Sequence, residues 1–174
     1  MKFRIGLWLA LGAWFALPPH ARATASAGLG DDIAIIVNRS NPVETLSVAE
    51  LRAIFLAERK SWPDGRRITI AVRRPGEPER GTVLETICRM TEESLTRYML
   101  HRVFIGETPS VPKTLTTANG VRRFVVNVPG AIGYVRISDL DASVKAILVA
   151  GIAPGAEGYA VKLKAPGGAE QGAR

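Results

Sequence analysis

The stretch from residue 71 to residue 82 gathers the residue types that bind small anions. Guanidinium groups pair with carboxylates and phosphates through charge-assisted hydrogen bonds, and the free amides at a helix start also attract anions. The residues of this kind are Arg73, Arg74, Gly76, Arg80, Gly81 and Thr82. We expect Ser40 and Asn41, with Arg39, to face them across the sheet edge. The spacing therefore predicts an anion or carboxylate site in a loop between a strand and a helix.

The same stretch carries groups that oppose anion binding. Glu77 and Glu79 repel an oxyanion within a few ångströms, and Pro78 has no amide hydrogen to donate. In the alternative interpretation, the two glutamates pair with the neighbouring arginines in a solvated loop, while Pro78 occupies the first turn of a helix. The residues alone leave both interpretations open.

Residue types that catalyse reactions or hold metals are sparse. Cys88 is the only cysteine, and its apolar neighbours predict a buried, inert side chain. Beyond residue 27, His101 is the only histidine, so the sequence offers no partner for thiol activation or for a histidine-based metal site. We expect Trp62 and Tyr134 to pack in the core or at its edge rather than to stack on a ligand. With no Ser-His-Asp set and no glycine-rich nucleotide loop, we expect neither an enzyme nor a cofactor or metal.

Residues 1–27 predict a signal peptide. Lys2 and Arg4 precede an apolar run over residues 5–17, and small residues that follow it place the expected cleavage at residues 23–27. The run is shorter than the roughly 20 apolar residues of a membrane-spanning helix, and nothing later in the chain is apolar enough to cross a membrane. We therefore expect a secreted, periplasmic protein whose mature chain has no membrane span.

The charge pattern argues against nucleic acid as a partner. The formal net charge is +7, and the predicted signal accounts for three of the positive charges. The remaining basic residues are scattered among acidic ones. Nucleic-acid-binding proteins cluster their basic residues on one face, so we expect a solvated surface and no nucleic-acid partner.

Strands and helices able to position the loop alternate along the chain. Short apolar runs predict strands at residues 33–37, 68–72, 131–135 and 144–149. Capping residues and apolar stripes predict helices at residues 48–57, from residue 83, after Thr91, and after Thr116 or Thr117. This alternation predicts a three-layer α/β/α sandwich with a mostly parallel mixed sheet. We assign residues 30–152 to one domain and residues 153–174, rich in Gly, Ala and Pro, to a largely disordered tail.

Four motifs in order resemble one family. They are Asn38–Asn41 followed by Pro42, the helical stretch 46–55, the turn at 62–65, and the stretch 129–135, Pro-Gly-Ala-Ile-Gly-Tyr-Val. Together they resemble the periplasmic substrate-binding proteins of phosphate ABC transporters, in particular the short single-domain members. The resemblance extends from about residue 33 to residue 151 and mainly covers the second lobe of that family.

The resemblance implies a fold, a ligand and a partner. The fold is one lobe of a type II periplasmic binding protein-like domain, the ligand is phosphate or another small oxyanion, and the partner is an ABC transporter or another periplasmic protein. The family loop has Arg, two variable residues and then Gly-Ser-Gly-Thr; Arg73 and Gly76 match it, whereas Glu77, Pro78 and Glu79 replace its last three residues. The alternative is a single-lobe interaction module that has lost solute binding and contacts a periplasmic or membrane partner.

Overall fold

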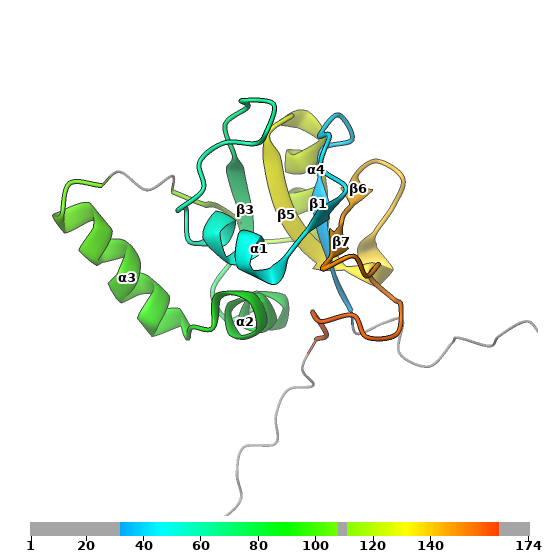
Figure 1. Ribbon diagram of the computed structural model, residues 1–174. Coiled ribbons are helices and arrows are strands. Elements are labelled where there is room, and N and C mark those ends of the chain that lie inside the picture. The colour runs from blue at the N-terminus through cyan, green and yellow to red at the C-terminus, as the bar shows by residue number, and fades with distance from the viewer. Residues whose placement is uncertain (1–31, 108–110, 164–174) are drawn as a thin grey trace, which may run out of the picture.

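One mixed five-stranded sheet forms the centre of the protein (Figure 1). The computed structural model describes residues 32–107 and 111–163, so the predicted signal peptide lies outside the described part of the chain. Among the described helices, none combines the length and the apolar character that crossing a bilayer requires.

The strands of this sheet do not all run in the same direction. They are β1 (Ile33–Val37), β3 (Thr69–Arg73), β4 (Lys113–Leu115), β5 (Ala131–Arg136) and β6 (Lys145–Ala146), in the order β4-β3-β5-β1-β6. β3 is parallel to β4 and β5, whereas β1 is antiparallel to both of its neighbours, β5 and β6. Four strands therefore share one direction and β1 runs against them, which confirms the predicted mostly parallel mixed sheet.

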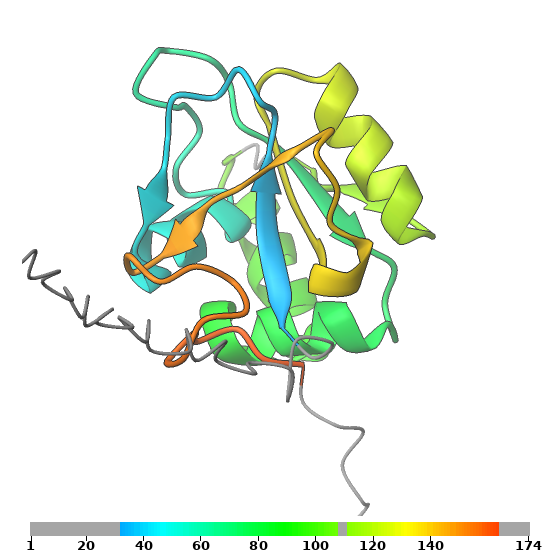
Figure 2. The ribbon, with the colours of Figure 1, turned by 90° about the vertical axis from the view of Figure 1, so that its right-hand side faces the viewer.

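Helices cover both faces of the sheet. Figure 2 shows α4 (Ala118–Asn127) on one side and α1 (Val48–Phe55) on the other. α2 (Pro78–Val83) and the π-helical turn η1 (Leu84–Cys88) pack on the same face as α1. Because both faces are covered, β1 is buried along its whole length. The predicted three-layer α/β/α sandwich is confirmed.

Local sequence signals place the helix starts. The Ser47 hydroxyl accepts a hydrogen bond from the Glu50 amide at 3.2 Å, and the Glu50 carboxylate accepts one from the Ser47 amide at 2.9 Å, which completes the predicted capping box. Thr91 caps α3 (Glu92–Phe104), and Thr117 caps α4. The helix that we predicted from residue 83 begins five residues earlier, because Pro78 suits the first helical position.

The predictions were least accurate for the strands with the weakest sequence patterns. The strand predicted at residues 144–149 divides at Ile147 into β6, which pairs with β1, and β7 (Leu148–Val149), which pairs with β2 (Thr45–Leu46). β2 and β4 were not predicted, because strands of two or three residues carry almost no alternation.

Residues 153–163, which we predicted to lie in a disordered tail, belong to the fold. Tyr159 and Val161 are buried, the Tyr159 hydroxyl donates to the Ile33 carbonyl at 2.8 Å, and the Ile33 amide donates to the Val161 carbonyl at 2.8 Å. The predicted domain end at residue 152 is therefore wrong, since the domain extends at least to residue 163. The residues of the predicted tail beyond 163 lie outside the described part.

Candidate functional site

The arginine-rich stretch forms a loop between a strand and a helix, as predicted. β3 ends at Arg73, and α2 begins at Pro78. Gly76 has a φ of +87°, a left-handed conformation that glycine adopts without steric cost. Pro78 occupies the first turn of α2, as the alternative interpretation expected.

Glu77 lies between two arginines of this loop. Its Oε2 accepts a hydrogen bond from Arg73 Nη2 at 2.9 Å, and its Oε1 accepts one from Arg74 Nε at 2.7 Å. The hydrogen bond from Arg74, together with the positive charges of both arginines, lowers the pKa of Glu77 below its ordinary value. The carboxylate is therefore held in its charged form and neutralises the loop from within.

Arg73 is the most enclosed cation of the loop. The residue is buried, its backbone amide donates to the Tyr134 hydroxyl at 3.1 Å, and its Nη2 is used by Glu77. Among the described residues, Arg73 Nε and Nη1 have no hydrogen-bond partner. Buried donors without partners are costly, so these two nitrogens are the part of the loop with unused capacity for an anion.

Arg80 joins α2 to α3 and also contacts the end of β3. Its Nε and Nη2 donate to the two carboxylate oxygens of Glu92 at 2.7 and 2.5 Å, and its Nη1 donates to the Arg73 carbonyl at 2.9 Å. Burial opposes the charge of Arg80, but the hydrogen bond and charge of Glu92 outweigh it and raise the arginine pKa. The bidentate pair ties α2 to the start of α3, so Arg80 is already occupied.

Glu79 is a buried carboxylate in the first turn of α2. Its Oε1 accepts a hydrogen bond from Arg136 Nε at 2.6 Å, whereas its Oε2 has no partner among the described residues. The alternative interpretation placed Glu79 in a solvated loop with a neighbouring arginine, and this detail is wrong. Its partner comes from the end of β5 instead, because α2 packs against that strand.

The start of α2 offers few amides to a ligand. The amides of Arg80 and Gly81 both donate to the Glu77 carbonyl, at 3.0 and 3.1 Å, and Pro78 has no amide hydrogen. Gly81 is exposed and Thr82 is buried within the helix. These two residues therefore lie in the body of α2, whereas the sequence prediction placed them among the ligand contacts.

Ser40 and Asn41 do not face this loop. They follow the carboxyl end of β1, and β1 is antiparallel to β5, which is parallel to β3. The carboxyl ends of β1 and β3 therefore lie at opposite edges of the sheet. The expectation that Ser40 and Asn41 join Arg73 and Arg80 in one site is wrong, because it assumed that β1 and β3 run in the same direction.

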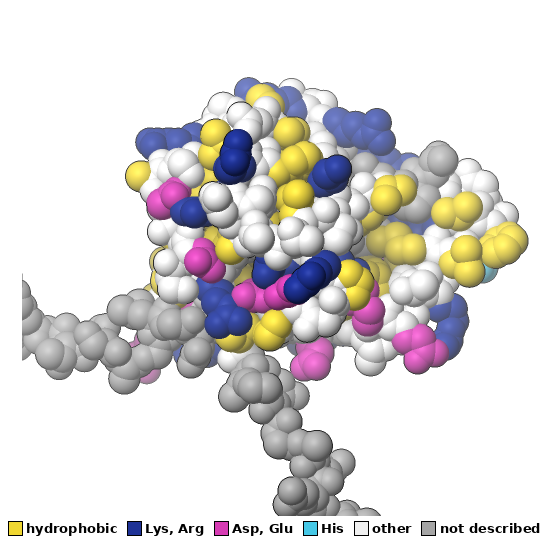
Figure 3. All heavy atoms as spheres, turned by 180° about the vertical axis from the view of Figure 1, so that it is seen from behind, with side chains coloured by type: hydrophobic (Ala, Val, Ile, Leu, Met, Phe, Trp, Pro, Cys, Tyr) yellow, Lys and Arg dark blue, Asp and Glu magenta, His cyan; other side chains and the backbone are white. Residues whose placement is uncertain are grey.

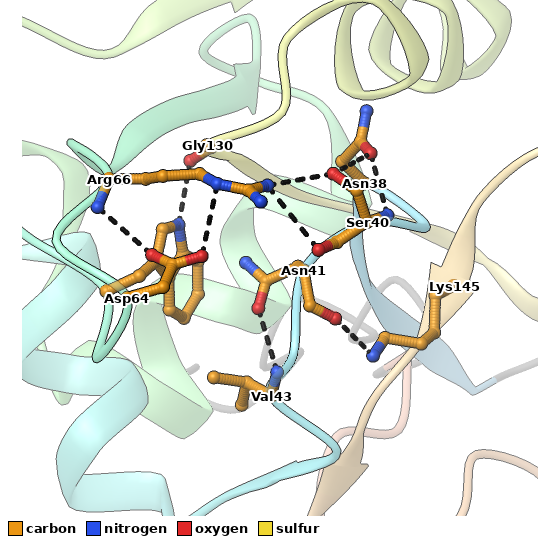
Figure 4. A network of polar contacts seen from close by, with 9 residues as sticks. Asn38, Ser40, Asn41, Val43, Asp64, Arg66, Gly130 and Lys145 are labelled. Carbon is orange, nitrogen blue, oxygen red and sulfur yellow. Dashed lines mark hydrogen bonds and ion pairs between the residues drawn. The ribbon is translucent and has the colours of Figure 1, made fainter.

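At the opposite edge of the sheet, Ser40 and Asn41 belong to a network of polar contacts (Figure 4). Asn38 Nδ2 donates to two carbonyls at the end of α4, and its Oδ1 accepts hydrogen bonds from the amide and hydroxyl of Ser40. Arg66 Nη1 donates to the Ser40 hydroxyl at 2.9 Å, and Lys145 Nζ donates to the Asn41 carbonyl at 2.5 Å. The Asn38 contacts hold this loop against α4, and those of Arg66 and Lys145 hold it against a second loop and β6, so the network is structural in character.

The sequence reasoning missed two residues outside the loop that form ion pairs with it, Glu92 and Arg136. Glu92 lies 12 residues from Arg80, and Arg136 lies 57 residues from Glu79. The acidic first turn of α3 was noticed only as a helix signal, and no local pattern marks Arg136. With them, four arginines and three glutamates meet around the loop, which leaves one net positive charge.

Comparison with known proteins identifies relatives of this chain. A family model described as the PBP superfamily domain matches residues 24–170. A curated relative, the phosphate-binding protein PstS of Bacillus subtilis (strain 168), is 29% identical over 133 residues, which cover 74% of this chain and 39% of the relative.

Two solved structures have a similar fold. A phosphate ABC transporter substrate-binding protein with bound phosphate from Clostridium perfringens gives a TM-score of 0.60 at 23% identity, over 73% of this chain and 49% of that chain. An ABC-type phosphate transport receptor from Vibrio cholerae gives a TM-score of 0.58 at 23% identity, over 73% of this chain and 50% of that chain. The present chain thus spans half or less of each relative's length. The family model matches most of the sequence, and these relatives are of the kind that the sequence motifs resemble. The chain therefore belongs to the PBP superfamily.

Proposed function

We propose that this protein is an exported, single-lobe binding-protein module that acts by contacting a periplasmic or membrane partner, such as an ABC transporter, and no longer holds phosphate. The observation that supports this proposal is the Glu77 carboxylate, which bonds Arg73 and Arg74 in the loop where the family motif begins. A tethered carboxylate has a high effective concentration. A free oxyanion therefore has to displace it before it reaches Arg73.

The remaining charges of the loop support the same proposal. Arg80 is paired with Glu92, and Arg136 is paired with Glu79, so both arginines already have carboxylate partners. Glu79 adds a second negative charge at the start of α2, where an anion would otherwise be favoured. A phosphate dianion has to overcome repulsion from Glu77 and Glu79 together.

A second candidate function is binding of phosphate or another small oxyanion. It is favoured by one observation, the two nitrogens of Arg73 that lack partners among the described residues. In this candidate Glu77 swings out, and Arg73 and Arg74 grip the anion beside Gly76. Arg80, Gly81 and Thr82 only shape the surroundings, and Ser40 and Asn41 take no part.

Calorimetric titration with inorganic phosphate, sulfate and acetate separates the two candidates. The exported protein is compared with Glu77→Gln, which keeps the side-chain shape but removes the competing charge. Glu93→Gln is the matched control, because Glu93 is exposed on α3 and pairs only with Arg97 among the described residues. We expect no heat from the wild type or from Glu93→Gln, and phosphate binding in the millimolar range from Glu77→Gln.

Each outcome of the titration decides between the candidates. Phosphate binding by the wild type at micromolar concentration, lost in Arg73→Ala, contradicts the interaction module and supports the second candidate. If neither the wild type nor any variant gives heat, the interaction module remains the proposal, and the idea of an anion site masked by Glu77 is removed. Pull-down from periplasmic and membrane extracts then tests the module itself, and recovery of nothing above background counts against it.

A further inference from the structure

Basic residues that are far apart in the sequence meet at one edge of the sheet. The carboxyl end of β1 lies at this edge together with the amino ends of β3, β5 and β6, because β1 is antiparallel to β5 and β6, and β3 is parallel to β5. The loops and the helix end that meet there carry four exposed cations, which we call the basic edge: Arg39, Lys60, Arg67 and Arg123. Figure 3 shows Lys and Arg side chains around the top of the molecule, where Figure 1 places these loops.

Hydrogen bonds between the loops fix this arrangement. Arg66 Nη1 donates to the Ser40 hydroxyl at 2.9 Å, and Trp62 Nε1 donates to the Gly130 carbonyl at 3.0 Å. Asn38 Nδ2 donates to two carbonyls at the end of α4. The loop after β1, the loops before β3 and β5, and the end of α4 therefore form one continuous surface.

The carboxylates of the same segments do not neutralise the basic edge. Residues 38–44, 57–68 and 140–145 contain four acidic residues. Three of them form ion pairs with other cations and the fourth bonds a tyrosine: Asp64 with Arg66, Glu44 with Lys145, Asp141 with Arg122, and Glu58 with Tyr98. Among the described residues, no carboxylate forms an ion pair with a member of the basic edge, which therefore keeps its positive charge.

Apolar side chains are exposed beside these cations. Val126, in the last turn of α4, is 41% exposed, and it follows Arg123 by three residues, so the two are neighbours on the surface of the helix. Pro63 and Pro129 are exposed in the two turns that the hydrogen bond from Trp62 joins. The edge therefore combines positive charge with a small apolar surface.

We propose that the basic edge binds the surface of an anionic lipid membrane. The four cations meet the phosphate groups, while Val126 and the two prolines lie at the level of the headgroups. Each Lys or Arg residue near such a surface strengthens binding roughly fivefold. Several of them act together, because one membrane presents many headgroups. The exposed apolar side chains add contacts with the boundary between headgroups and acyl chains.

The free cations of the basic edge suit lipid headgroups better than an acidic protein. Fixed carboxylates are recognised by guanidinium groups held in a set geometry, as in the bidentate pair of Arg80 and Glu92. In the basic edge, Arg39 bonds only a backbone carbonyl, and no bond from the other three side chains to a described residue fixes their position. Headgroups rearrange around such cations, whereas carboxylates fixed on a folded protein do not.

Co-sedimentation with sucrose-loaded vesicles tests the proposal. We expect the exported protein to bind vesicles of equal parts phosphatidylcholine and phosphatidylglycerol at about 20 mM sodium chloride, and to bind at least tenfold more weakly at about 500 mM, because salt screens exposed charges. Vesicles of phosphatidylcholine alone are expected to bind at least tenfold more weakly at low salt.

The double variant Lys60→Gln/Arg67→Gln locates the binding surface. We expect it to bind the anionic vesicles about 25-fold more weakly, from roughly fivefold for each charge. Both side chains are exposed and neither is in an ion pair, so the fold stays intact, which circular dichroism checks. The charge-conserving variant Lys60→Arg/Arg67→Lys is expected to bind as the wild type does, because a membrane surface reads charge and not the shape of the cation.

Arg97→Gln/Lys162→Gln is the matched control with the same loss of charge. Arg97 is exposed on α3, and Lys162 is exposed beside Asp32, which precedes β1 at the opposite edge of the sheet. We expect this variant to bind the anionic vesicles within about twofold of the wild type, since short-range attraction depends on the cations nearest the membrane.

Four outcomes overturn the proposal. They are no binding to the anionic vesicles at low salt, equal binding to phosphatidylcholine alone, equal weakening by the two double glutamine variants, and weakened binding in the charge-conserving variant. Binding to soluble poly-L-glutamate without binding to the vesicles assigns the basic edge to an acidic protein instead. The inference rests on the proposed function only in that the protein is exported and meets a membrane. The vesicle measurements do not involve the arginine loop, so this inference and the loss of phosphate binding fail independently.

Discussion

Protonation of Glu77 is expected to weaken the loop after β3. The hydrogen bond from Arg74 and the charge of Arg73 lower the pKa of Glu77 below about 4.5 in the folded state. A lowered pKa adds stability above the unfolded-state pKa, and this stability is lost as the pH falls through the folded-state pKa. Urea unfolding at pH 7 and at pH 3 therefore should show a gap between the wild type and Glu77→Gln that closes in acid. Arg74→Gln, which removes the main cause, should shrink the gap at pH 7, and a gap that persists at pH 3 contradicts the assignment.

At the same scale, the sequence predicted contacts between near neighbours and missed distant ones. The competition between anion and carboxylate was visible in the spacing of Arg73, Arg74 and Glu77, because residues three and four apart meet in a tight loop or helix turn. Arg136 could not be assigned to Glu79, since only the packing of α2 against β5 brings the two together. Burial of Cys88 was expected from its apolar neighbours and is confirmed, and Trp62 and Tyr134 pack in the core.

The contact between α4 and β5 depends on the absence of a side chain at Gly133. A Cβ built there meets Val121 Cγ1 at 2.8 Å and the Ala71 carbonyl oxygen at 3.3 Å. Gly133→Ala is therefore expected to push α4 from the sheet and to lower the free energy of unfolding by about 1–3 kcal/mol, as overpacking of a core does. The measurement is urea unfolding at neutral pH.

Gly81→Ala is the matched control for that substitution. Gly81 lies in α2, its φ is not positive, and a Cβ there meets nothing within 4 Å. Alanine in an open helical position is expected to raise the free energy of unfolding by roughly 0.5–1 kcal/mol. If Gly133→Ala raises the free energy of unfolding as Gly81→Ala does, the packing of α4 on Gly133 is looser than the structure indicates.

The direction of a buried strand is the element-scale property that the sequence could not supply. The run 33–37 predicts a strand covered on both faces, and such a run has the same apolar pattern whether its neighbours are parallel or antiparallel. Only the pairing of β1 with β5 decides that Ser40 and Asn41 lie at the sheet edge opposite Arg73. The fold class was therefore predictable, while two of the eight expected site residues, Ser40 and Asn41, were misplaced by one strand direction.

At the scale of the whole molecule, the composition of the C-terminal region gave a wrong domain end. Glycine and proline predict irregular backbone, and residues 153–163 are indeed free of long elements. Irregular backbone is not disorder, however, when apolar side chains anchor it. Tyr159 and Val161 are two anchors of this kind, and neither forms a periodic pattern that the sequence reasoning could detect.

Two truncations of the full chain test where the domain ends. Removal of residues 164–174 is expected to leave the free energy of unfolding unchanged. Removal of residues 153–174 deletes two buried side chains and the bonds to Ile33, and we expect it to lower the free energy of unfolding by about 3–6 kcal/mol, from about 1.5–3 kcal/mol for each buried side chain. Tyr159→Phe in the full chain isolates the hydroxyl bond and should cost about 1 kcal/mol. Thermal and urea unfolding that give the same stability for both truncations would restore residue 152 as the end of the domain.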